Sequence, residues 1–340
     1  MVKRMMLLAA VVALTSVPVA AQTPVKAPAK PATTYVPPKT PWGDPDLQGN
    51  YTNKYEQGTP FERPAELEGK TLADISDKEL ADLVAKRQQS TIERDRFISG
   101  DPTGTIAGPL EFRDIFEIKK ASRAWFVTDP PDGKIPPMTP EARQRIAARR
   151  PTGSSFSNGV YDSYESLSLY DRCITRGFPT SGMPTIYGNS SRIVQGPGYI
   201  AIQYEMIHET RLIPIDKDPR PHPGRNIHLD MGDSRGHWEG DTLIVETTNF
   251  TQRSVYRNAN PDTLKITERF TKVAPNKLRW SVTLDDPRTW TKPWTFSMPL
   301  TLNDAEPIQL YECHEGNYGL RNILSAARAE ERTLSNATKP

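Results

Sequence analysis

The chain has 340 residues, of which 36% are hydrophobic and 25% are charged. This composition allows a sizeable core of one large domain or two small ones, and it excludes collagen-like, coiled-coil and wholly disordered proteins. The 32 prolines argue against an all-helical protein, because an interior proline removes a helical hydrogen bond and clashes with the preceding turn.

Residues 1–21 have the pattern of a secretory signal peptide. Lys3 and Arg4 precede the apolar run 5–14, and small residues at 19–21 suit cleavage. Removing this segment leaves 41 basic and 41 acidic side chains, so the mature chain is neutral and no nucleic-acid partner is expected. No other stretch approaches the ~20 apolar residues of a transmembrane helix. We therefore expect a periplasmic or secreted protein without a transmembrane segment in the mature chain.

The chain contains two cysteines, Cys173 and Cys313. An even pair in an exported protein predicts a disulfide, and closing this loop would stabilise the fold by about 5 kcal/mol on the chain-entropy model. Two separate buried thiols are the alternative. Neither cysteine lies in a CxxC motif, so we expect no zinc-thiolate or redox role.

The first part of the mature chain predicts a proline-rich tether at 22–41 and a wrap with helices at 42–154. A capping box of Ser76 and Glu79 predicts a helix that ends near Arg96. A strand is expected at 121–127. A second helix is expected to start at Thr139 and to end before Pro151.

Residues 155–315 predict an antiparallel meander that closes into a calycin-like β-barrel, so the fold is mainly β. The longest predicted strand is 199–213. Its inward face would hold Ile200, Ile202, Tyr204, Met206, His208 and Leu212, and its outward face Ala201, Gln203, Glu205, Glu209 and Arg211. Further strands are predicted at 241–250, 263–273, 277–284, 294–300 and 308–313. Residues 316–340 predict a C-terminal helix and tail, the helix packing on the barrel through its apolar stripe.

Four long motifs carry a resemblance to known sequences. They are YDRCITRGFP at 170–179, YEMIHETRLIPID at 204–216, MGDSRGHWEGDTLIVETTNF at 231–250 and YECHEGNYGL at 311–320. Together they resemble a widespread family of uncharacterised exported bacterial proteins. The resemblance covers nearly all of the mature chain and implies an exported, β-rich protein. It implies no catalytic residue, because the family has no established activity.

The main candidate site consists of polar residues on apolar strand faces. Tyr204 and His208 share the inward face of their predicted strand, and Glu268 lies between Ile266 and Phe270. A histidine and a carboxylate in one apolar cavity can act as a general acid–base pair. We assign His208 as base, Tyr204 as proton donor or oxyanion partner, and Glu268 as the orienting carboxylate. The alternative is a buried structural pair, or Glu268 hydrogen-bonded to an arginine or to backbone.

Two weaker patterns lie between 222 and 237. Ser234 sits in a G-x-S-x-G motif, but a strand follows where a serine hydrolase needs a helix. The alternative there is a glycine-rich loop ordered by Asp233 and Arg235. The residues His222, His228 and Asp230, with His237 nearby, could ligate a metal, but their spacing matches no established site.

A disulfide would also bring Asp171 and Arg172 close to His314, which could form a polar cluster at the barrel mouth. An ion pair between Arg172 and Glu315 is the alternative. The residues predicted to contribute to binding are Arg172, Asp233, Arg235, His237 and His314.

The leading functional hypothesis is an exported lyase or isomerase that acts on a small, mainly apolar molecule without a cofactor. The first alternative is a non-catalytic binding protein that uses the same cavity. A module whose barrel is filled by side chains and a serine or metal-dependent hydrolase are further alternatives. The oligomeric state stays open.

Overall fold

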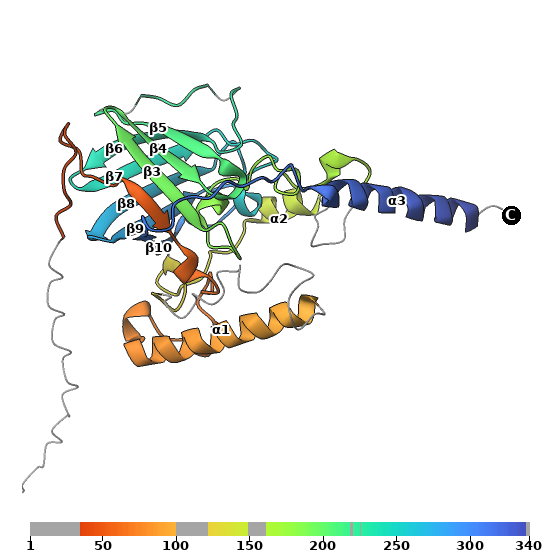
Figure 1. Cartoon of the computed structure of the whole chain (residues 1–340), viewed down its shortest axis with the longest axis horizontal. Coiled ribbons are helices and arrows are strands. Elements are labelled where there is room, and N and C mark those ends of the chain that lie inside the picture. The colour runs from red at the N-terminus through yellow and green to blue at the C-terminus, as the bar shows by residue number, and fades with distance from the viewer. Residues whose placement is uncertain (1–34, 100–121, 149–160, 218–219, 225, 338–340) are drawn as a thin grey trace, which may run out of the picture. The chain divides into compact units, whose positions relative to one another are not determined.

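The computed structural model describes residues 35–99, 122–148, 161–217, 220–224 and 226–337. The predicted signal peptide and most of the predicted tether lie outside these residues. Within them the chain forms a mainly β structure built around a nearly closed antiparallel barrel (Figure 1).

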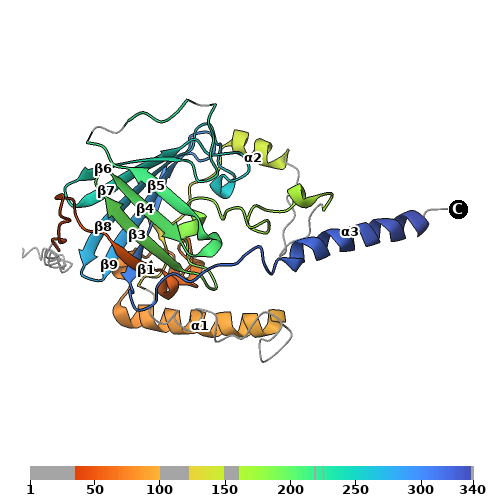
Figure 2. The same cartoon turned by 45° about the horizontal axis from the view of Figure 1, so that its top comes forward.

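Nine strands make up the barrel, in the order β5-β4-β3-β1-β10-β9-β8-β7-β6. They are β1 (Gly49–Thr52), β3 (Ser190–Gly196), β4 (Tyr199–Tyr204), β5 (Thr210–Pro214), β6 (Asp233–Glu239), β7 (Thr242–Thr248), β8 (Lys265–Ala274), β9 (Lys277–Asp285) and β10 (Trp294–Leu302). The short strand β2 (Val127–Asp129) pairs with β10 outside this ring. Figure 2 shows β3, β4 and β5 crossing in front of β6, β7 and β8, as two walls of one barrel.

The barrel closes between β5 and β6. Every other neighbouring pair is antiparallel. Because the number of strands is odd, the two end strands of this order, β5 and β6, run in the same direction. Among the described residues, one parallel bridge joins the seam, between Ile215 and Gly236, and the Asp216 amide donates to the Gly236 carbonyl at 3.1 Å. A Cβ at Gly236 would lie 2.5 Å from Ile215 Cδ1, so a larger residue there would displace the end of that side chain.

Four predicted strands, at 241–250, 263–273, 277–284 and 294–300, are confirmed as β7 to β10. The predicted strand at 308–313 is wrong, because those residues form no strand. The free edge of β10 is occupied by β1, where Tyr51 pairs with Leu302. The predicted N-terminal wrap thus supplies β1 and β2 to the sheet, although the predicted barrel began at 155.

The predicted strand 199–213 is two strands. The chain turns at 205–209, where Ile207 has φ 65°, and the Tyr204 amide donates to the Glu209 carbonyl at 2.9 Å. The alternation therefore restarts in β5. Leu212, predicted inward, is 63% exposed, and Arg211, predicted outward, is only 4% exposed.

The predicted helices are present as α1 (Asp77–Ser99), α2 (Pro140–Ala147) and α3 (Tyr318–Ala337). The Ser76 and Thr139 hydroxyls cap α1 and α2, accepting from amides three residues on at 3.2 and 3.1 Å. No described side chain of α3 is buried, so the predicted packing of its apolar stripe on the barrel is not observed.

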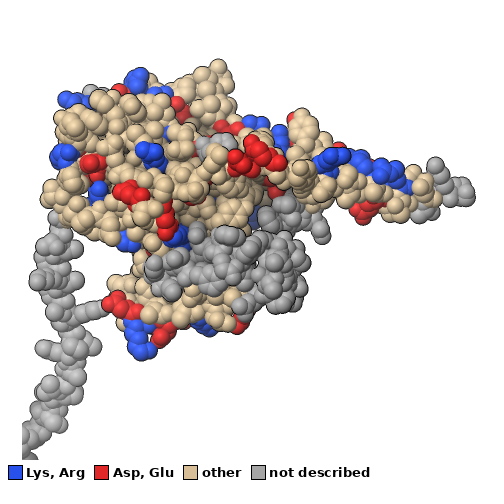
Figure 3. Space-filling model, viewed as in Figure 1, with Lys and Arg blue, Asp and Glu red and all other residues tan. Residues whose placement is uncertain are grey.

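Aromatic rings fill much of the barrel interior. Trp280 meets Phe296 edge-on with ring centres 5.6 Å apart, and Trp294 meets Trp290 in the same way at 5.5 Å. On the outside, basic and acidic side chains are interspersed over the barrel face in Figure 3, without an extended patch of either sign. No helix among the described residues has both the length and the apolarity needed to cross a membrane.

Candidate functional site

A buried ion pair occupies the barrel interior. Arg211 of β5 reaches Glu268 of β8 with both terminal nitrogens, Nη2 to Oε2 at 2.7 Å and Nη1 to Oε1 at 3.2 Å. Their side chains are 2% and 0% exposed. The alternative in which Glu268 is hydrogen-bonded to an arginine is therefore the arrangement observed.

Hydroxyl groups from three strands also accept from the terminal nitrogens of Arg211, whereas its Nε is buried without a hydrogen-bond partner. Arg211 donates from Nη1 to the Tyr204 hydroxyl at 3.2 Å, and from Nη2 to Ser234 Oγ at 2.9 Å and Thr247 Oγ1 at 3.2 Å. The Phe178 ring centre lies 3.8 Å from the guanidinium carbon. The cluster thus links β5 with β4, β6, β7 and β8.

The Glu268 carboxylate accepts a third hydrogen bond, from the Trp280 indole nitrogen at 2.9 Å. Burial raises the pKa of Tyr204 to about 12, against the opposing charge of Arg211. Burial alone would lower the pKa of Arg211, but the charge of Glu268 outweighs it and leaves that pKa above its ordinary value. Tyr204 and Arg211 therefore keep their protons at neutral pH.

Tyr204 and Glu268, both predicted on inward strand faces, are buried and both contact Arg211, which was predicted on the outward face. The length of the predicted strand 199–213 could have revealed this error. Its 15 residues greatly exceed the usual ~5–6 and indicate a turn within the segment. His208 ends the turn Met206–His208, and its side chain lies outside what the structure describes.

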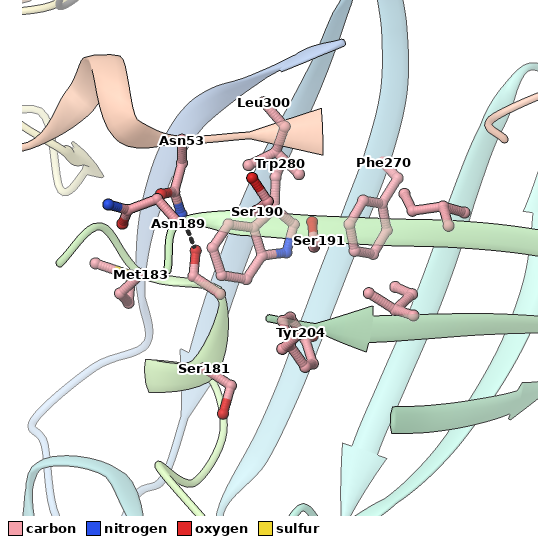
Figure 4. Close-up of a pocket in the computed structure, with 13 residues that line it drawn as sticks. Asn53, Ser181, Met183, Asn189, Ser190, Ser191, Tyr204, Phe270, Trp280 and Leu300 are labelled. Carbon is pink, nitrogen blue, oxygen red and sulfur yellow. Dashed lines mark hydrogen bonds between the residues drawn. The ribbon is translucent and has the colours of Figure 1, made fainter. Parts of the chain in front are cut away.

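A cavity lies next to this cluster, with Tyr204 and Trp280 in its wall. Its other lining residues are Asn53, Ser181, Gly182, Met183, Asn189, Ser190, Ser191, Ile193, Ile202, Phe270 and Leu300. The space between them is about 420 Å³ including its opening, but the cavity volume is about 20 Å³, enough for one water molecule. Figure 4 shows the Asn53 and Asn189 amides beside the Trp280 ring.

Asn53 is one of the lining residues, and its side-chain oxygen is buried. The residue is 5% exposed, and its Nδ2 donates to the Gly182 carbonyl at 2.7 Å. Its Oδ1 atom has no hydrogen-bond partner. The turn Thr180–Gly182 presents that carbonyl because it packs directly on Trp280, where a Cβ at Gly182 would lie 2.7 Å from the ring.

A second pocket of about 260 Å³ lies at residues 222–265 and is lined by His222 and His228, among others. Asp233 Oδ1 lies 2.8 Å from His222 Nδ1, and Arg235 holds the same carboxylate with two hydrogen bonds of 2.8 and 3.0 Å. The other ring nitrogen, Nε2, lies 3.5 Å from Glu246 Oε1. The ring is thus oriented by a carboxylate that is itself held in place.

The weak metal candidates fall into separate networks. His228 Nδ1 lies 2.9 Å from the Phe250 carbonyl oxygen, and Asp230 is paired with Arg253 at 2.7 Å. Within the described ranges, no three His, Cys, Asp or Glu side chains are arranged to hold a metal ion. Ser234 sits within strand β6, is 7% exposed and is hydrogen-bonded to Arg211, so it is not presented as a nucleophile.

The predicted disulfide between Cys173 and Cys313 is confirmed, with a Cα–Cα distance of 5.7 Å. The polar cluster predicted around it, of Asp171, Arg172 and His314, stays a prediction. The Arg172 guanidinium lies over the Tyr164 ring at 5.2 Å and is not paired with Glu315, and His314 is exposed.

His237 also lies apart from these groups. Its Nε2 lies 3.5 Å from Glu239 Oε1, and its side chain is 32% exposed. It therefore contributes to neither pocket.

In comparisons with known proteins, the chain matches no family, no curated protein and no solved structure.

Proposed function

We propose that this chain is an exported binding protein that takes one small, mainly apolar molecule into the cavity beside Tyr204. One observation carries the proposal: the cavity wall is mainly apolar, with Met183, Phe270 and Trp280 among its residues, and it also includes the hydroxyl-bearing Ser190 and Ser191.

The buried cluster favours binding over catalysis in this cavity. Glu268 accepts hydrogen bonds from Arg211 and Trp280, so its oxygens are not free to take a proton from a substrate. Tyr204 keeps its proton because burial raises its pKa to about 12. A carrier needs only apolar walls and one or two hydrogen-bonding groups, and the cavity offers both.

Entry of anything larger than water requires a side chain to move. Met183 lines the cavity and is only partly buried, and methionine is unbranched and flexible enough to repack around a ligand.

The disulfide supports export, since such bonds persist in oxidising compartments. Together with the signal-like segment 1–21, it supports a periplasmic or secreted location.

A cavity-filling variant tests the proposal. Ser191 lies on the inward face of β3 and lines the cavity, so Ser191→Leu should fill the remaining space. We expect indole to bind the wild type with one-to-one stoichiometry in isothermal titration calorimetry, and Ser191→Leu to weaken that binding at least tenfold.

Val194→Leu is the matched control, because Val194 lies on the same strand and is 39% exposed. It should bind indole like the wild type. A wild type that shows no saturable binding, or a Ser191→Leu variant that binds equally well, would refute the cavity as a binding site.

The second candidate function is an acid–base enzyme, favoured by the His222–Asp233 pair beside its own pocket. Because an ionised carboxylate only accepts, Nδ1 carries the hydrogen in that contact, and in the neutral form of the ring the lone pair is then on Nε2. A histidine held this way can act as a base or a nucleophile.

Cleavage of 4-nitrophenyl acetate tests this candidate. The Nε2 atom of His222 would take the acetyl group, 4-nitrophenolate would leave, and water would then release acetate. His222→Gln should lower the rate at least tenfold, and Asp233→Asn should lower it less. His237→Gln, on the same strand as Asp233, is the control. Equal rates in the wild type and His222→Gln would rule out an activated His222.

A further inference from the structure

We infer that the protein has a separate binding site, for a neutral saccharide, in the pocket that Trp42 and Trp238 line. This pocket shares no lining residue with the cavity beside Tyr204 or with the pocket of His222, so the inference goes beyond both proposed functions. Its volume is about 370 Å³, within the usual ~300–1,000 Å³ of small-molecule sites. It can therefore take a ligand without the rearrangement that the cavity beside Tyr204 requires.

Segments far apart in the sequence meet at this pocket. Trp42 and Asp44 come from the N-terminal segment, Ile215, Asp216 and Lys217 from the residues after β5, and Trp238 from β6. The turn between β3 and β4 completes the wall. Backbone hydrogen bonds join these segments, because the Ile215 amide donates to the Gly198 carbonyl at 2.8 Å and the Asp216 amide donates to Gly236. The pocket is thus built on the barrel itself.

Trp42 is held in place although it is 37% exposed. Its indole nitrogen donates to Asp44 Oδ2 at 3.0 Å. The turn that carries it is closed by the Thr40 amide, which donates to the Asp44 carbonyl at 2.8 Å. Lys39 fastens this turn to the barrel through an ion pair with Asp241 at 2.6 Å. An exposed ring that is already held loses little freedom when a ligand binds.

Trp238 supplies a second indole ring to the same wall. It is half-buried and packs against the barrel core. The face of an aromatic ring carries partial negative charge, so it attracts positively polarised hydrogens. A pyranose ring presents C–H groups of this kind on its faces and hydroxyl groups around its edge. Two indole rings in one pocket therefore suit the faces of a sugar ring.

The charged residues of the wall indicate a ligand that both donates and accepts hydrogen bonds. Asp44 and Asp216 offer acceptors and Lys217 offers donors, and a hydroxyl group can pair with either kind. A quaternary ammonium ion is the alternative, since indole rings also attract cations. Two positive charges oppose it, because Lys217 lies in the same wall and Arg220 Nε already donates to Asp216 Oδ2 at 2.9 Å. A neutral ligand meets no such repulsion.

Titration with cellobiose, maltose, lactose and N,N′-diacetylchitobiose, followed by tryptophan fluorescence and by calorimetry, tests the inference. We expect the wild type to bind at least one of these disaccharides saturably. Trp42→Leu keeps an apolar side chain but removes the ring, so it should weaken that binding at least tenfold. Trp42→Phe restores a ring and should recover much of the affinity. Because the ligand is neutral, about 0.5 M NaCl should leave the affinity unchanged.

Tyr318→Leu is the matched control, because Tyr318 is a 70% exposed aromatic residue of α3 that does not line the pocket. It should bind the disaccharide like the wild type. A wild type that binds none of the four disaccharides would overturn the inference, and so would a Trp42→Leu variant that binds as tightly as the wild type. Trp42-dependent binding of tetramethylammonium in place of the sugars, weakened by salt, would also overturn it and would make the pocket a site for organic cations.

Discussion

Arg211 is the residue on which the barrel interior depends. Its side chain is 2% exposed, and its terminal nitrogens contact groups from β4, β6, β7 and β8. Moving two charges out of water is costly, and the cost is offset here by a two-point contact with Glu268 and by further hydrogen bonds. The guanidinium thus connects strands on both sides of the seam, where backbone pairing is sparse.

Removing one partner of this pair should be worse than removing both. Arg211→Met leaves the Glu268 carboxylate buried without its counter-charge and should lower the free energy of unfolding by about 3–5 kcal/mol. The double variant Arg211→Met with Glu268→Met should recover most of that loss, because no charge is left inside. Urea unfolding of the three proteins gives the comparison. A double variant no more stable than Arg211→Met would contradict the buried-charge explanation.

At the scale of elements, the turn between β4 and β5 decides which side chains enter the barrel. Residues 199–213 alternate well enough to resemble one long strand, but five residues at 205–209 reverse the chain. No glycine or asparagine marks the turn in the sequence. Instead Ile207 adopts φ 65°, a value that β-branched residues rarely take. The reversal moves Leu212 outside and Arg211 inside.

At the scale of the whole molecule, the N-terminal and C-terminal parts of the described chain are attached in different ways. The N-terminal strand β1 inserts between β3 and β10 and so joins two meanders into one barrel. The C-terminal segment has no such place, because no described residue from 303 to 336 is buried. It is attached by polar contacts, such as the Asn303 amide to the Asn50 carbonyl at 2.7 Å, and by the disulfide.

Loss of the disulfide should therefore release the C-terminal segment as well as destabilise the fold. Cys173→Ala with Cys313→Ala opens a loop of 140 residues and should lower the free energy of unfolding by up to about 5 kcal/mol. Limited proteolysis should then cut after Leu302 faster than in the wild type and leave the barrel intact. Unchanged proteolysis of residues 303–336 would show that the polar contacts suffice to hold it.

Sequence alone determined the features that depend on local periodicity, on capping residues and on the number of cysteines. Alternation predicted β7 to β10, capping residues predicted α1 and α2, and an even cysteine pair predicted the disulfide. It also placed Glu268 among apolar neighbours, where the structure buries it.

Only the tertiary structure decided which distant groups meet. The partner of Glu268 follows from a turn at 205–209 that propensity does not mark. The place of β1 follows from a free edge of β10 nearly 250 residues away in sequence. The unpaired oxygen of Asn53 follows from a carbonyl at Gly182 that takes up the rest of its amide. Such contacts arise from packing between segments far apart in the chain, and no local pattern records them.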